Sequence, residues 1–128
     1  MTDLEIENAG FVDHPYIEMC GCSPDGLLPD GGIIEVKSPL TSTFIDYLLS
    51  DKVPTEYVNQ VQWQLECTER NWGYFVAYDP RMPIDLQLFV KKFERDQDRI
   101  DEIKIAVRQF LREVDLTIES LNKLRGAK

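Results

Sequence analysis

Residues 21–39 read GCSPDGLLPDGGIIEVKSP, and the fold is organised around this stretch. Residues 33–37 are β-prone and lie between two glycines and a proline, which predicts a short strand. Side chains two apart on a strand share a face, so Glu35 and Lys37 are expected to point the same way, about 6 to 7 Å apart. The intervening apolar residues then face the opposite layer.

A second carboxylate precedes this strand. The loop at 26–32 is rich in glycine and contains a proline, so it can reverse the chain and bring Asp25 alongside Glu35. Two carboxylates suit Mg²⁺ or Mn²⁺, and a metal-bound water oriented by Lys37 would make a phosphodiesterase centre. The alternative is a surface hairpin with a glutamate–lysine pair, because the spacing E-x-K is common by itself.

The longer pattern carries a resemblance. Ser23–Gly26 followed by Ile34–Pro39 resembles the PD-(D/E)XK nuclease signature, in the form used by the phage lambda exonuclease and its viral recombinase relatives. Downstream, residues 57–62 (YVNQVQ) resemble the family's helix with a glutamine facing the active site. Residues 72–75 (WGYF) and 78–82 (YDPRM) resemble its following strand and turn. The likeness runs from about residue 10 to residue 115.

The resemblance implies a fold, an activity and a set of residue roles. The fold would be α/β (α+β), a restriction-endonuclease-like core with a mixed sheet of about five strands flanked by helices. The activity would be that of a Mg²⁺-dependent 5′–3′ exodeoxyribonuclease acting on double-stranded DNA ends in phage-type recombination, with Mn²⁺ able to substitute. Asp25, Glu35 and the Val36 carbonyl would bind the metal, Lys37 would activate water, and Gln60 would position it.

The same family implies further partners and an alternative function. Its members form a ring-shaped trimer and work with a single-strand annealing recombination protein. They also carry an N-terminal helical region with another acidic metal ligand and an arginine for the DNA 5′ phosphate. Only 24 residues precede Asp25, and none is lysine or arginine. The alternative is therefore a truncated, weakly active or inactive module of the same fold that binds DNA or a recombination partner.

Length and charge are consistent with one domain over residues 1–128. The net charge is -9, but its distribution is uneven: residues 1–36 hold eight acids and no lysine or arginine, whereas the remaining 15 acids face 14 bases. Basic groups that could meet phosphates are few, and the same residues would also fit an ordinary solvated surface. They are Lys91, Lys92, Arg95 and Arg99.

No apolar run is long enough to cross a membrane, and the acidic first residues are unlike a signal peptide. We therefore expect no membrane contact and a cytoplasmic location in a bacterial host cell. Cys20 and Cys22 are too close to bridge comfortably, and His14 is the single histidine, so buried free thiols are favoured over a disulfide framework or a zinc site.

Periodicity predicts the order of the elements. Strands are expected at 3–7, 11–12, 16–20 and 33–37 as an antiparallel meander, followed by helices at 41–49 and 54–69, strands at 72–78 and 86–93, and a long amphipathic helix at 96–125. In the second helix, Val58, Val61 and Leu65 should face the sheet, and Gln60 and Gln64 should lie on a separate stripe. The first half of the last helix should pack against the sheet, leaving the turns past residue 114 free for another subunit or protein.

Overall fold

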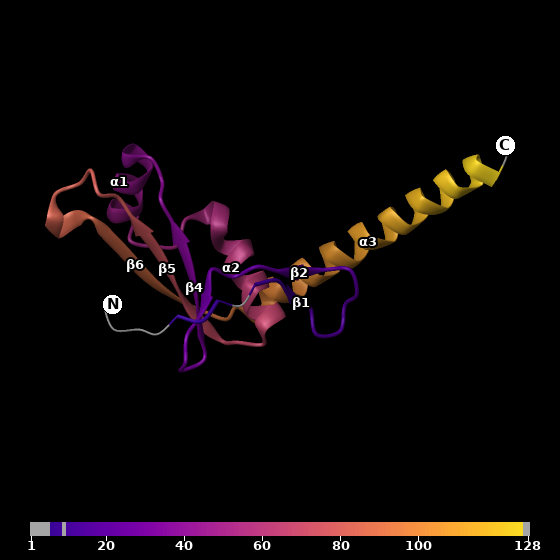
Figure 1. The fold of residues 1–128 in the computed structure, drawn as a ribbon, viewed down its shortest axis with the longest axis horizontal. Coiled ribbons are helices and arrows are strands. Elements are labelled where there is room, and N and C mark those ends of the chain that lie inside the picture. The colour runs from indigo at the N-terminus through magenta and orange to yellow at the C-terminus, as the bar shows by residue number, and fades with distance from the viewer. Residues whose placement is uncertain (1–5, 9, 127–128) are drawn as a thin grey trace.

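A four-stranded mixed sheet carries the elements of the predicted motif in this computed structural model, which describes residues 6–8 and 10–126. Its strands lie in the order β3-β4-β5-β6, and helices pack against the sheet (Figure 1). The strands are β3 Gly26–Leu27, β4 Gly32–Lys37, β5 Trp72–Tyr78 and β6 Leu88–Glu94. The helices are α1 Thr41–Ser50, α2 Thr55–Thr68, α3 Gln97–Gly126 and a short 3₁₀ turn, η1 Ile84–Leu86.

The strand directions follow from the connections. β3 and β4 form a hairpin, and β5 and β6 pair antiparallel, whereas β4 and β5 run parallel with Glu35 opposite Phe75. Parallel neighbours need a long crossover, which α1 and α2 provide. The predicted α/β class with a mixed sheet, flanking helices and a long C-terminal helix is therefore confirmed, with four strands in the main sheet of the described residues instead of about five.

The core lies between the sheet and the two crossover helices. Phe44 and Tyr47 of α1 and Val61 and Leu65 of α2 pack onto Phe75 at the centre of the sheet. Each large apolar side chain buried in this way contributes about 1.5–3 kcal/mol to folding. This packing determines which face of α2 lies against β4. The Glu35 side chain points from β4 toward that face of α2.

The predicted N-terminal meander is wrong. β1 Val12–Asp13 pairs with β2 Gly21–Cys22 in a separate two-stranded sheet, so neither joins the main sheet. The strand expected at 16–20 is a turn, in which Met19 has a positive φ of 67°. His14 holds this turn, because its Nδ1 accepts the backbone N–H groups of Tyr16 and Ile17.

The strand that forms the hairpin with β4, β3, is one that periodicity did not predict. β3 has two residues, and a Cβ at Gly26 would come within 2.1 Å of Ile6 Cγ2, so the tight packing here needs glycine. The strand expected at 3–7 falls mainly outside the described residues. Of its described part, Glu7 forms an antiparallel bridge with Leu27 at the edge of the sheet.

The long helix packs differently from the prediction. α3 lies against α2 and not on the sheet, and Ile100 is its fully buried anchor. Beyond this contact the helix projects away from the body of the molecule (Figure 1). Among the described residues, no helix combines the length and the apolar character that a bilayer span requires.

Candidate functional site

Glu35 is the centre of the candidate site. Its side chain comes from the middle of β4 and points toward α2, and the residue is only 3% exposed. Lys37 Nζ lies 3.1 Å from Oε1, and Gln60 Nε2 lies 3.2 Å from the same atom. Gln64 Nε2 donates to Oε2 at 2.9 Å. A buried carboxylate needs such donors, because burial without partners disfavours the charged form.

Asp25 reaches the same strand from the hairpin. It immediately precedes β3, and the register of β3 with β4 sets Gly26 opposite Ile34, which leaves Asp25 beside the next residues of β4. Its Oδ2 accepts the backbone N–H of Val36 at 2.7 Å. The β3–β4 hairpin, and not a structureless loop, therefore brings the two predicted carboxylates onto one stretch of β4.

Lys37 is held on two sides. Glu35 shares its face of β4, as the two-residue spacing predicts, and the ammonium also lies 4.6 Å from the centre of the Tyr57 ring. Tyr57 stacks on Phe75, which connects this cation–π contact to the core. Val36 lies between Glu35 and Lys37 and points to the other side of the strand. Val36 is 44% exposed, so the layer predicted on that side does not cover its side chain.

The two glutamines occupy successive turns of α2. Residues four apart on a helix lie on one face, and Gln60 and Gln64 both reach Glu35 across the gap between α2 and β4. Gln64 is 2% exposed, so the separate polar stripe predicted for this helix is wrong at that residue. The sequence reasoning gave a role to Gln60 alone. The i, i+4 spacing of two glutamines opposite an E-x-K strand is the signal that could have identified both.

A turn that contains the buried Asp79 supports the end of β4. Asp79 Oδ1 accepts the backbone N–H and the Nε–H of Arg81, and Arg81 NH2 donates to the Pro39 carbonyl at 3.1 Å. The bond from Arg81, opposed by burial and assisted by Thr41, holds the pKa of Asp79 below its ordinary value. Asp79 therefore links the turn after β5 to the chain that leaves Lys37, a supporting role that its position in the sequence motif did not reveal.

The donor set fits a hard divalent cation. Asp25, just before β3, and Glu35, on β4, offer carboxylate oxygens, and within the described residues no group of three or more histidine, cysteine or acidic side chains is placed to hold a metal ion. Mg²⁺ is ordinarily held by one or two carboxylates with several waters, and it completes its shell with substrate phosphates. Two carboxylates brought onto one stretch of β4 are compatible with that mode of binding.

The basic residues singled out in the sequence are largely engaged elsewhere. Arg95 forms an ion pair with Glu66 and donates to the Leu65 and Arg70 carbonyls, so it is a structural residue. Arg99 donates to Asn59 Oδ1 at 3.0 Å. Lys91 lies 3.5 Å from Asp51, and Lys92 lies over the Trp72 ring. Lys91 thus meets the end of α1 and Lys92 meets β5, so neither has a partner in the α2–α3 junction.

The three cysteines are free thiols, as the sequence predicts. Cys22 and Cys67 are buried between β2 and α2, and Cys20 is half-buried. The pKa of the Cys67 thiol is raised because its S–H donates a hydrogen bond to Cys22 and because it is buried. These thiols belong to the packing of the small sheet against α2.

The comparisons with known proteins point to one family. The family model described as a YqaJ-like viral recombinase domain matches residues 1–71. No curated protein sequence matches the chain. The alkaline exonuclease LHK-Exo from Laribacter hongkongensis is 43% identical with a TM-score of 0.92, and the match covers 95% of this chain and 63% of that one. A second structure of LHK-Exo, in complex with dAMP, gives the same values.

A more distant structure supports the fold alone. A phage-related exonuclease from Haemophilus somnus 129PT is 14% identical with a TM-score of 0.55, over 79% of this chain and 55% of that one. The present chain thus spans less than two thirds of the length of these structures. The matched family model covers the hairpin, β4 and all of α2, which are the elements that carry the site residues. The chain belongs to the family of YqaJ-like viral recombinase domains, in agreement with the resemblance found in its sequence.

Proposed function

We propose that this chain is the catalytic core of a Mg²⁺-dependent deoxyribonuclease that digests double-stranded DNA from its ends. The single observation that carries the proposal is the Glu35 site: a buried carboxylate has Lys37 and Gln60 on one oxygen, and Asp25, just before β3, accepts the backbone N–H of the next residue, Val36. The exonuclease structures that resemble the chain support the reaction class. One of them holds dAMP, the type of product that hydrolysis of DNA from an end releases.

Each residue has a proposed role. Asp25, Glu35 and the Val36 carbonyl would hold the metal, with Mn²⁺ able to replace Mg²⁺; when bound, the ion supplies a Lewis acid and lowers the pKa of a coordinated water. Lys37 donates hydrogen bonds that orient the attacking water and stabilises negative charge at the phosphorus. Gln60, anchored through Nε2 to Glu35, presents its carbonyl oxygen as an acceptor that positions this water.

The test is a nuclease assay on 5′-phosphorylated linear duplex DNA with Mg²⁺ or Mn²⁺. We expect wild-type activity to disappear with a chelator and to fall by about 10²–10³-fold in Lys37→Ala, because a preorganised charged donor is lost. Lys52→Ala, which changes an exposed lysine in the loop after α1, is the matched control and should retain activity. If wild type is no more active than Lys37→Ala, the chain is not a nuclease.

The direction of digestion is a finer part of the proposal. We propose 5′–3′ exonucleolytic attack, as in the resembled phage enzymes. Duplexes labelled at the 5′ or the 3′ end should then release the 5′ label first, and covalently closed circles should stay intact. Early release of the 3′ label would reverse the polarity, and cleavage of the circles would indicate endonucleolytic attack.

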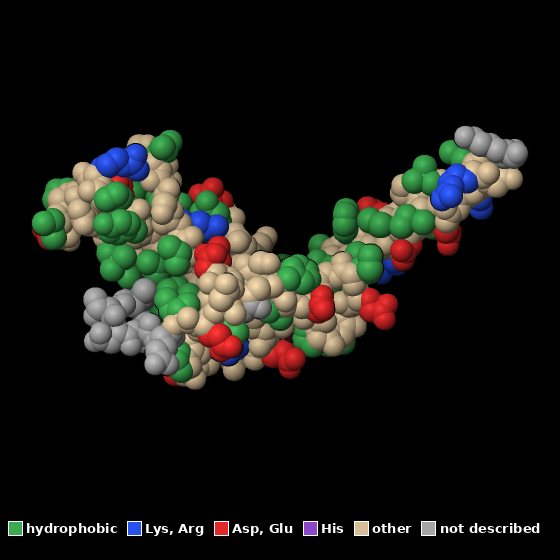
Figure 2. Space-filling model, in the orientation of Figure 1, with side chains coloured by type: hydrophobic (Ala, Val, Ile, Leu, Met, Phe, Trp, Pro, Cys, Tyr) green, Lys and Arg blue, Asp and Glu red, His purple; other side chains and the backbone are tan. Residues whose placement is uncertain are grey.

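We also propose that the chain associates with other proteins through the outer half of α3. Leu116, Ile118, Leu121 and Leu124 are exposed there, and Figure 2 shows hydrophobic side chains along this part of the helix. The family would provide two kinds of partner, the other subunits of a ring trimer and a single-strand annealing protein. Light scattering of the purified chain should show a trimer mass, and a monomer mass at working concentrations would exclude the ring for this chain.

A further inference from the structure

Gln64 holds the oxygen of Glu35 that no other described side chain holds. Lys37 and Gln60 both act on Oε1, at 3.1 and 3.2 Å, whereas Gln64 Nε2 is the donor to Oε2, at 2.9 Å. The last torsion of a glutamate side chain is broad, so a carboxylate bonded at one oxygen can still rotate. Donors on both oxygens fix the plane of the group.

The orientation of the Gln64 amide is set by charge. With Nε2 toward Glu35, the carbonyl Oε1 is buried and has no hydrogen-bond partner in the described part of the chain. Flipping the amide would place this acceptor against a carboxylate oxygen, which is also an acceptor, so the flip is unfavourable. The fold thus leaves one buried acceptor unsatisfied in order to keep a donor on Glu35.

A neighbouring glutamine shows what a structural role looks like. Gln62 is also buried on α2, but both ends of its amide are used: Nε2 donates to the Glu94 carbonyl at 2.9 Å, and Oε1 accepts the Asp96 N–H at 2.8 Å. Gln62 therefore ties α2 to the end of β6 and the start of α3. Buried polar groups ordinarily pair in this way. Gln64 departs from that pattern at the candidate metal ligand.

We infer that Gln64 is a positioning residue for the reaction, acting through Glu35 and not on the substrate itself. This inference rests on the proposed nuclease function. Outer residues that orient a metal ligand commonly change metal affinity or activity by about 10–100-fold when mutated. Gln64 has this position relative to Glu35, whereas Gln60 is the residue proposed to meet the water.

The test compares Gln64→Met with Gln62→Met in the full chain. Methionine keeps the unbranched shape and removes both polar atoms, so Gln64→Met also removes the unsatisfied acceptor. We expect Gln64→Met to leave Tm within about 3 °C, because removal of the unsatisfied acceptor offsets loss of the donor to Glu35, to weaken Mn²⁺ binding about 10-fold in calorimetry without DNA, and to lower kcat about 10–100-fold with KM for DNA unchanged. We expect Gln62→Met to lower Tm while the Mn²⁺ affinity of the folded protein stays within twofold.

The outcomes separate the two claims. If wild type binds Mn²⁺ and cleaves DNA, and Gln64→Met matches it in Mn²⁺ affinity and kcat, the inference is overturned and the proposed function stands. A parallel loss of Tm and kcat in Gln64→Met also overturns it, since Gln64 would then be structural. If wild type binds Mn²⁺ without cleaving DNA and Gln64→Met weakens that binding, the proposed function fails while the positioning role holds. Absence of Mn²⁺ binding to wild type overturns both.

Discussion

Glu35 is costly for the fold to bury, so its environment indicates a use other than stability. Desolvation of a charged pair can exceed the attraction between its members, and replacing such pairs by apolar residues is often neutral or stabilising. Here one carboxylate takes donors from Lys37, Gln60 and Gln64. An arrangement of this kind fixes a charge in position, which a metal ligand requires and a stable core does not.

Tyr57 offers a separate test of how Lys37 is held. The ammonium lies 4.6 Å from the ring centre, and a cation–π contact is worth about 0.5–2 kcal/mol, depending on its exposure to water. We predict that Tyr57→Leu lowers kcat of the proposed nuclease about 3- to 10-fold, because Lys37 loses this restraint. The measurement is kcat on linear duplex DNA, made beside a thermal melt.

Tyr57→Phe is the matched control for that prediction. Phenylalanine keeps the ring face under Lys37 and the stacking on Phe75, so kcat should stay within about twofold of wild type. Equal losses in the leucine and phenylalanine variants would show that the hydroxyl, and not the ring face, matters. A loss that follows Tm would assign the effect to packing instead.

The residues of the site differ in how far sequence could predict them. The spacing of Glu35 and Lys37 was enough to place both on one face, because the period of a strand is fixed. Gln60 was identified by resemblance alone. Gln64 was missed because an isolated helix pattern does not reveal which partner lies across from it. Burial against a distant strand is a tertiary property, and β4 precedes Gln64 by more than 25 residues.

At the scale of elements, Glu66 joins parts that are far apart in the chain. It pairs with His14 from the region of β1, with Arg95 after β6, and with Lys104 on α3 at 3.6 Å. Burial alone raises the pKa of Glu66, but the bonds from His14 and Arg95 and the charge of Lys104 outweigh it, so the net pKa lies below the ordinary value. Tyr16, which lines a surface pocket together with Glu66, donates a further hydrogen bond to Glu66 Oε2.

We predict that Glu66→Gln lowers the free energy of unfolding by about 1.5–3 kcal/mol at neutral pH, since the partly buried Arg95 and Lys104 lose their charged partner. The lowered pKa sets the pH dependence. The stabilisation is present above the unfolded carboxyl pKa of about 4.3 and is lost as pH falls through the lower folded value. Urea titrations between pH 2 and 8 should show a steeper acid loss in wild type than in Glu66→Gln.

An exposed acid on α3 is the control for this prediction. Glu102→Gln should change the free energy of unfolding by no more than about 0.5 kcal/mol and leave its pH profile unchanged. Identical acid profiles for wild type and Glu66→Gln would contradict the role of this junction.

On the alkaline side, Lys104 gives stability the opposite pH dependence. The hydrogen bond with Tyr16, opposed by burial and assisted by Glu66, raises the pKa of Lys104. The stability that Lys104 contributes is present below about pH 10.4 and is lost as pH rises through the raised value.

The elements themselves were predictable where local pattern was strong. The ranges of α2, β5 and the long helix followed periodicity closely, and their boundaries differ by a residue or two. The failures lie in the first 30 residues. The turn at 16–20 is held by His14, whose orientation depends on Glu66, 52 residues away. β3 has only two residues and begins with a glycine that sequence reading assigns to a turn. Both depend on contacts that a local pattern does not contain.

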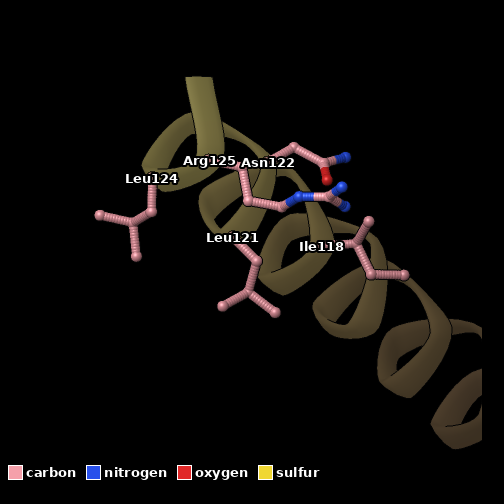
Figure 3. Close-up of a pocket in the computed structure, with 5 residues that line it drawn as sticks. All are labelled: Ile118, Leu121, Asn122, Leu124 and Arg125. Atoms are coloured by element: carbon pink, nitrogen blue, oxygen red, sulfur yellow. The ribbon is translucent and has the colours of Figure 1, made fainter. Parts of the chain in front are cut away.

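The whole molecule consists of a packed body and a helix that extends beyond it (Figure 1). The inner part of α3 is anchored on α2 by Ile100, but every described residue after 114 is exposed. A surface depression at the outer end is lined by residues of α3, drawn as sticks in Figure 3, and this end of the helix lies away from β4 (Figure 1). Its residues are Ile118, Leu121, Asn122, Leu124 and Arg125.

Deleting residues 115–128 should therefore leave the body folded. Those described side chains bury nothing in the body, so we predict a Tm within about 3 °C of the full chain in dilute solution. Ile100→Ala is the contrasting variant, because loss of a fully buried isoleucine costs about 2–5 kcal/mol and should lower Tm clearly. If the outer helix also mediates association, the deletion should lower the mass seen by light scattering while Tm at low concentration is unchanged. A large fall in Tm at every concentration would instead show that the outer helix supports the body itself.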